Sequence, residues 1–123
     1  MQFELSYNGL RAQVESLGGE LVSLTDPSGT EYIWCGNSAY WSGRNPVLFP
    51  IVGRLRDGVT TFDGIPYEIA QHGFARRQEF AVIDRADDHV VFAGSGRVSY
   101  AVKSTVAIAD CYGRIHFGRC CEL

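Results

Sequence analysis

The sequence lacks the features that mark several large classes of protein. Its 123 residues include four cysteines, one methionine and a single lysine, Lys103. Basic residues are fewer than acidic ones, 11 against 14, so the net charge of −3 excludes the basic excess expected of a nucleic-acid-binding protein. No apolar run approaches the roughly 20 residues that a membrane-spanning helix needs. We therefore expect neither a nucleic acid nor a membrane as partner.

Signals of secretion and of metal binding are also missing. The first ten residues alternate apolar and polar side chains and contain no basic region followed by an apolar one, so we expect a cytoplasmic protein. The cysteines are not spaced as zinc ligands usually are, and nothing indicates the oxidising surroundings in which disulfides form. We predict free thiols and no metal site at Cys35, Cys111, Cys120 and Cys121.

The composition that remains is that of an ordinary globular domain. Apolar residues make up 46% of the chain and charged residues 20%, which argues against disorder. A length of 123 residues suits one domain that can bury a core without disulfides or metals.

The pattern of apolar residues predicts an all-β fold. Residues 3–7 alternate apolar and polar side chains, and Asn8-Gly9 then gives the strongest short signal for a β-hairpin, returning as a second strand over residues 10–16. Further strands are predicted over residues 20–25, 31–34, 59–62, 65–69, 79–85, 89–92 and 98–109. Residues 36–50 read as a long ordered loop, and no strong amphipathic helix is present. Many short strands separated by turns indicate an antiparallel β-sandwich or a barrel.

The densest group of unusual residues lies between Trp41 and Phe80, on loops between the predicted strands. It contains Trp41, Arg44, Arg54, Arg56, His72, Arg76 and Arg77. Arginine and histidine supply the donors that sugar hydroxyls need, and aromatic rings pack on apolar sugar faces. On spacing alone we favour the alternative, in which the arginines are solvated and Trp41 belongs to the core.

Two histidines and two aspartates in turns need separate interpretations. His72 is followed by Gly73, which allows a sharp turn that could aim the imidazole into a cleft, although a lone histidine is more often structural. His89 is expected to be exposed and inert, and no role is assigned to His116. The aspartates of Asp57-Gly58 and Asp63-Gly64 are interpreted as turn residues, not as catalytic ones.

Two segments resemble a known family. The sequence NPVLFPIVGRL at residues 45–55, here called the first motif, and QHGFAR at residues 71–76, the second motif, look like the aldose 1-epimerase (galactose mutarotase) family. They are most similar to its bacterial branch related to the lactose-operon X protein, which the segments EYIW (31–34) and AYW (39–41) also fit. The likeness extends from about Phe3 to Phe92.

The resemblance implies a fold, a reaction and a ligand. The fold would be a galactose mutarotase-like antiparallel supersandwich, and the reaction the interconversion of the α and β anomers of an aldose, a small-molecule sugar, without a cofactor. A base takes the proton of the anomeric hydroxyl while an acid protonates the ring oxygen, so the two groups need separated pKa values. Arg54 and His72 match family residues that bind the sugar.

The same resemblance places the catalytic pair beyond the end of this chain. The family acid is a second histidine and the base a late glutamate, and neither His116 nor Glu122 stands in the matching context, so we assign no catalytic residue. We interpret residues 1–96 as the N-terminal part of the sandwich and 97–123 as a divergent tail, with a truncated or frame-shifted gene product as the hypothesis, and expect this chain to be inactive alone.

Two alternatives remain open beside the epimerase. One is a glucose-6-phosphate 1-epimerase, in which Arg44 or the pair Arg76-Arg77 would bind the phosphate. The other is a non-catalytic carbohydrate-binding half domain, which would associate with another chain through uncovered sheet edges.

Overall fold

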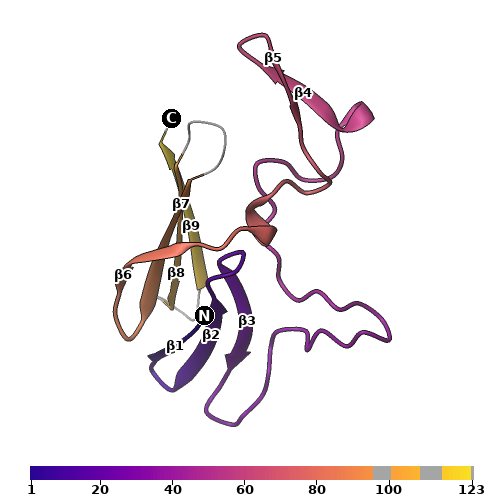
Figure 1. Ribbon diagram of the computed structural model, residues 1–123. Helices are drawn as coiled ribbons and strands as arrows, with labels where there is room; N and C mark the ends of the chain where they lie inside the picture. The colour runs from indigo at the N-terminus through magenta and orange to yellow at the C-terminus, as the bar shows by residue number, and fades with distance from the viewer. Residues whose placement is uncertain (96–100, 109–114, 123) are drawn as a thin grey trace.

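The computed structural model describes residues 1–95, 101–108 and 115–122 of the chain (Figure 1). The described elements are strands and two short 3-10 helices. The strands are β1 (Gln2–Tyr7), β2 (Leu10–Glu15), β3 (Glu20–Thr25), β4 (Val59–Phe62), β5 (Ile65–Glu68), β6 (Ala81–Arg85), β7 (His89–Ser95), β8 (Ala101–Ile108) and β9 (Ile115–Glu122). The helices are η1 (Arg56–Gly58) and η2 (Ala75–Arg77). Among the described residues, no helix has the length and apolar character needed to cross a bilayer.

The described strands form three antiparallel sheets, which confirms the predicted antiparallel all-β fold. Their orders are β1-β2-β3, β4-β5 and β6-β7-β8-β9. Figure 1 shows the three-stranded and four-stranded sheets together, with the β4–β5 hairpin extending away from them.

The first hairpin forms for the reason that its sequence indicates. Asn8 and Gly9 have φ angles of 47° and 82°, which are the two positive values that a type I′ turn needs. The turn pairs Tyr7 with Leu10 and fixes the register of β1 against β2. Because side chains alternate along a strand, Phe3 is buried while its neighbour on β1, Glu4, is exposed.

The core lies between the three-stranded and four-stranded sheets. The rings of Phe3 on β1 and Phe92 on β7 meet edge to face, with centroids 5.7 Å apart. Ser6 on β1 donates its backbone N–H to the carbonyl of Asp87, at the turn before β7, at 2.7 Å. The buried cluster contains Phe3, Leu5, Ala12, Val14, Leu21, Ala75, Phe80, Val90 and Phe92.

The outer edge of β3 is covered by the segment that follows it. The carboxylate of Glu31 accepts hydrogen bonds from the Ser23 hydroxyl and from the backbone N–H groups of Leu24, at 2.9 Å, and Ile33, at 2.8 Å. Tyr32 in turn donates its N–H to the carbonyl of Leu24 at 2.9 Å. Since an exposed edge invites pairing with another chain, Glu31 protects β3 from strand addition.

The prediction of a strand over residues 31–34 is wrong. Within the described residues, this segment forms a single bridge, between Thr25 and Glu31. The Glu31 side chain takes the N–H groups of Leu24 and Ile33 that a regular ladder would have used. A side chain competing for backbone donors is a common reason for a strand to end.

Glu31→Gln is expected to weaken the fold in a pH-dependent way. Burial raises the pKa of Glu31, but the hydrogen bonds from Ser23 and the backbone outweigh it and hold that pKa below 4.5. A pKa depressed in the folded state stabilises the protein above about pH 4.5, and the stabilisation is lost as the pH falls through the folded-state value. The substitution should lower the free energy of unfolding by about 1 kcal/mol at neutral pH and by less near pH 3.

Urea denaturation at the two pH values measures this effect. Glu68→Gln is the matched control, because Glu68 is exposed on β5 and its carboxylate has no hydrogen bond within the described residues. Equal losses for the two variants, or a loss for Glu31→Gln that does not shrink at low pH, would contradict the assignment.

The predicted loop over residues 36–50 is confirmed, and two polar contacts tie its end to β3. Arg44 donates to the carbonyl of Val22 at 2.7 Å, and the Asn45 N–H donates to Glu20 Oε1 at 2.6 Å. Trp41 is 52% exposed, so the interpretation that places it in the core is wrong.

The C-terminal strands differ from the sequence interpretation. β8 lies within the strand predicted over 98–109, of which residues 98–100 and 109 fall outside the described residues. β9 was not predicted, although it pairs with β8 over its whole length, from Ala101 opposite Glu122 to Ile108 opposite Ile115. The proposed tail thus contributes two backbone strands to the four-stranded sheet.

Candidate functional site

The β4–β5 hairpin brings the two motifs together. Asp63 and Gly64 form its turn with φ angles of 51° and 77°, and the register pairs Val59 with Glu68. Just beyond the strands, the Ile69 N–H donates to the Gly58 carbonyl at 2.9 Å. Continuing this register toward the base of the hairpin places the end of the first motif opposite the start of the second.

The backbones of the two motifs come into close contact at Phe49 and Gly73. The two residues form a parallel bridge, and the carbonyl of Phe49 accepts the N–H groups of Phe74 at 2.9 Å and Ala75 at 3.3 Å. Gly73 has a φ of +74°, and a Cβ at this position would lie 1.9 Å from the oxygen of Phe49. The second motif therefore needs glycine here for two reasons, its backbone conformation and the close approach of the first motif.

His72 is held by the backbone of the first motif. Its N–H donates to the Gly53 carbonyl at 2.7 Å, and its Nδ1 accepts the Gly53 N–H at 2.9 Å. An Nδ1 that accepts a hydrogen bond places the proton of the neutral imidazole on Nε2. The geometry thus fixes both the orientation and the tautomer of His72, with Nε2 as a donor.

Gln71 lies between the two residues predicted to bind substrate. Arg54 donates to Gln71 Oε1 at 3.4 Å. Gln71 Nε2 lies 3.3 Å from Nε2 of His72, and this is a contact rather than a hydrogen bond, because the Gly53 N–H leaves the proton of the neutral imidazole on Nε2 and both nitrogens are then donors. The structure therefore brings Arg54 and His72 to one place, with a single amide between them.

A cavity of about 440 Å³ opens beside this group. Its lining consists of Arg54, Leu55, Asp57, Gly58, Ile69, Ala70 and Gln71. His72 is not part of the lining but lies beside Gln71, which is. Trp41, the aromatic residue considered for a sugar face, is also absent from this lining.

Asp57 belongs to this cavity, which the sequence analysis did not foresee. Its φ is +59°, and the Gly58 N–H donates to the Leu55 carbonyl at 3.1 Å, so Asp57 is a turn residue as predicted. Asp57, an acidic residue, also belongs to the same lining as Arg54. The sequence signal for this was the position of Asp57 at the base of the hairpin, close in the chain to Arg54.

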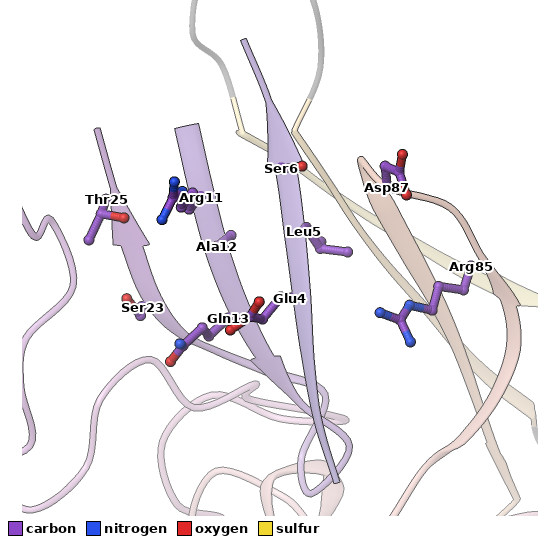
Figure 2. Close-up of a pocket in the computed structure, with 10 residues that line it drawn as sticks. All are labelled: Glu4, Leu5, Ser6, Arg11, Ala12, Gln13, Ser23, Thr25, Arg85 and Asp87. Atoms are coloured by element: carbon purple, nitrogen blue, oxygen red, sulfur yellow. The ribbon is translucent and has the colours of Figure 1, made fainter. Parts of the chain in front are cut away.

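A larger recess of about 560 Å³ lies elsewhere, on the polar face of the three-stranded sheet (Figure 2). Figure 2 shows Glu4 and Arg11 among the strand residues that border it, with Arg85 and Asp87 on its other side. The guanidinium of Arg85 lies 5.3 Å from the ring centroid of Phe3. None of the residues of the two motifs lines this recess, so it is separate from the predicted site.

Two of the arginines considered for phosphate binding have structural partners. Arg44 donates to the carbonyl of Val22, as described above. Arg76 donates to the carbonyl of Gln71 at 3.0 Å, and its Nε is buried without a hydrogen-bond partner among the described residues. Arg77 is exposed at the end of η2 and does not line the cavity.

Residues elsewhere in the chain have shifted pKa values. A hydrogen bond to Asp88, with a further one to Asp84, raises the pKa of His89 above 6.5, although partial burial opposes the shift. His89 is thus partly buried and engaged by carboxylates, at 2.8 Å from Asp88 and 3.4 Å from Asp84, rather than simply exposed as expected. Hydrogen bonds from Ser28 and the Thr30 backbone lower the pKa of Asp26 to about 2.

Among the described residues, no group of three or more His, Cys, Asp or Glu side chains is placed to hold a metal ion. Cys35 is a free, exposed cysteine, and the other three cysteines fall outside the residues whose side chains are described.

Comparison with known proteins matches the same segments. A family model described as aldose 1-epimerase matches residues 1–96. Two curated relatives, the plasmid and chromosomal forms of protein LacX from Lactococcus lactis subsp. lactis, are 37% identical over 100 and 101 residues. The match covers 76% of this chain and 33% of each relative, so the chain spans about a third of their length.

Solved structures show the same fold. A galactose mutarotase-related enzyme from Lactobacillus acidophilus matches with a TM-score of 0.82 at 26% identity, over 89% of this chain and 40% of that protein. A galactose mutarotase-like protein from Lactobacillus casei ATCC 334 matches with a TM-score of 0.81 at 27% identity, over the same shares. The predicted galactose mutarotase-like antiparallel fold is confirmed, and this chain belongs to the aldose 1-epimerase family.

Proposed function

We propose that this chain binds an aldose in the cavity at the base of the β4–β5 hairpin, as the sugar-contact part of an aldose 1-epimerase. The observation that carries the proposal is the convergence of the two motifs, which sets Arg54 and His72 on either side of Gln71. Hydroxyl groups both donate and accept hydrogen bonds, and Arg54 supplies donors while Gln71 supplies both kinds of group. His72 adds a donor at Nε2, whose direction the Gly53 N–H sets.

A neutral sugar suits this cavity better than a sugar phosphate. The lining contains one cation, Arg54, and one anion, Asp57, so no excess positive charge is present to bind a phosphate. The alternative assignment relied on Arg44 or the pair Arg76-Arg77. Arg44 and Arg76 already donate to backbone carbonyls, which disfavours a glucose-6-phosphate 1-epimerase.

The residues of this site support binding and orientation rather than the proton transfers. Opening and closing the sugar ring needs one base at the anomeric hydroxyl and one acid at the ring oxygen, at the same pH. Arg54 is a permanent cation and cannot serve as the base. We propose that His72 holds a hydroxyl through Nε2–H and that the acid and base belong to the longer family domain, so this 123-residue chain binds sugar without turning it over.

Arg54→Ala and His72→Ala are each expected to weaken binding of D-galactose and D-glucose by about 5- to 20-fold, the value of one or two net hydrogen bonds. The measurement is a titration followed by ¹H–¹⁵N NMR, which detects millimolar affinities and reports folding in the same spectra. Arg56→Ala is the matched control, because Arg56 is an exposed arginine two positions from Arg54 that does not line the cavity and, within the described residues, makes no contact with the Gln71 amide that lies beside Arg54 and His72. Loss of binding in all three variants, or in none, would remove the assignment.

Polarimetry tests the lack of turnover separately. Freshly dissolved α-D-galactose or α-D-glucose should mutarotate at the buffer rate in the presence of the chain, because proximity of acid, base and substrate supplies most of such a rate. Acceleration that depends on protein concentration would show that this chain contains the acid and the base.

A further inference from the structure

The chain contains two Asp-Gly turns that are alike in backbone geometry and different in surroundings. Asp57 and Asp63 have φ angles of 59° and 51°, each precedes a glycine of positive φ, and both are exposed. Asp63 is at the tip of the β4–β5 hairpin, whereas Asp57 lies at its base. Of the two, only Asp57 lines the cavity that contains Arg54.

The turn alone does not explain a carboxylate at position 57. Positions of positive φ are occupied at least as readily by glycine or asparagine, which suit the same backbone without a charge. Within the described residues, no hydrogen bond or ion pair engages the Asp57 side chain, in contrast to Asp26, whose carboxylate is bonded within its own turn to Ser28 and Thr30. The carboxylate of Asp57 is therefore available to a ligand.

The lining around Asp57 is otherwise poor in acceptors. Arg54 offers only donors, and the one amide oxygen of Gln71 has only one of its two acceptor positions left beside the hydrogen bond from Arg54. The other lining side chains are those of Leu55, Ile69 and Ala70, and Gly58 has none. A bound sugar brings several hydroxyl protons, each of which needs an acceptor once it leaves water. Asp57 is the one anionic acceptor that the described lining provides.

We infer that Asp57 is a specificity-determining residue of this site, which accepts a hydrogen bond from one sugar hydroxyl while Arg54 donates to another. The inference rests on the proposed function. The same carboxylate disfavours a phosphorylated sugar in the cavity, since two anions in one small site repel each other. Asp57 would thus select neutral aldoses in two ways, by accepting a hydrogen bond from a sugar hydroxyl and by repelling the phosphate group of a sugar phosphate.

The test uses substitutions that the turn tolerates. Asp57→Asn keeps the shape and suits the positive φ, so it should fold with an unchanged or slightly raised midpoint of unfolding. It should weaken binding of D-galactose and D-glucose by about tenfold, the value expected for a hydrogen bond to a charged acceptor. Binding of D-glucose 6-phosphate relative to D-glucose should improve by at least that factor. Asp63→Asn, the matched control, should change neither affinity.

The possible outcomes distinguish a failure of this inference from a failure of the proposed function. If the unmodified chain binds the free sugars and Arg54→Ala weakens them while Asp57→Asn does not, the inference is overturned and the proposed function stands. If Asp63→Asn weakens binding as much as Asp57→Asn does, the effect comes from the hairpin and the inference is again wrong. If the unmodified chain binds neither sugar in NMR titrations, both proposals are wrong.

Discussion

Gly73→Ala is expected to destabilise the protein by more than about 4 kcal/mol, enough to unfold a domain of ordinary stability. The Cβ of alanine would lie 1.9 Å from the carbonyl oxygen of Phe49 and 2.7 Å from the nitrogen of Pro50. Both are backbone atoms, so no side-chain movement relieves the overlap. The carbonyl of Phe49 also accepts the N–H groups of Phe74 and Ala75, and moving it away would break the hydrogen bonds that join the two motifs.

Gly64→Ala separates this close contact from the cost of backbone conformation. Gly64 has nearly the same φ, +77° against +74°, but a Cβ there has no heavy atom within 4 Å. Its replacement should cost only about 1 kcal/mol, from the left-handed conformation alone. Urea denaturation of both variants measures the difference, and similar free energies of unfolding would mean that the two motifs are not packed as described.

The hairpins are the part of the fold that the sequence predicts best. Asn8-Gly9 and Asp63-Gly64 each adopt two positive φ angles in succession, because these residue types tolerate that conformation at little cost. The second hairpin also carries information about the site. Its turn fixes the register in which Val59 pairs with Glu68. Continued beyond the strands, this register brings the two motifs opposite each other, so their approach could have been expected from the sequence alone.

The features that could not be predicted depend on side chains that form hydrogen bonds with backbone groups elsewhere in the sequence. Residues 31–34 have the composition of a strand, yet the Glu31 side chain folds back onto β3 and accepts the N–H of Leu24. The period-two pattern carries no sign of such competition. Likewise, nothing local in the sequence signals that Arg44 ties the loop over residues 36–50 to the Val22 carbonyl of β3, or that Trp41 on the same loop is exposed.

Only part of the candidate site could be predicted from the sequence. The resemblance to the family singled out Arg54 and His72, and the structure places them on either side of Gln71. Asp57 was correctly interpreted as a turn residue, but a turn residue can also present its side chain to a cavity, and only the three-dimensional arrangement reveals which of the two Asp-Gly turns does so.

Phe92→Ala should cost about 3–5 kcal/mol, because it leaves a cavity where the two larger sheets meet. Phe92 has no exposed surface, lies on β7 between β6 and β8, and contacts the ring of Phe3 from the other sheet at 5.7 Å. Truncation therefore removes both buried area and an aromatic pair that joins the sheets. Phe92→Leu, which keeps most of the volume, should cost less, which keeps the measurement possible if the alanine variant does not fold.

Phe62→Ala is the matched control for that result. Phe62 is also a strand phenylalanine with an aromatic neighbour, Tyr67, at 5.6 Å, but it is 48% exposed on the β4–β5 hairpin. Because about half of its surface already faces water, truncation should cost about 1 kcal/mol or less. In thermal or urea unfolding, Phe92→Ala should thus lose much more stability than Phe62→Ala. The reverse order would mean that the stability of this chain depends on its projecting hairpin rather than on the contact between β1 and β7.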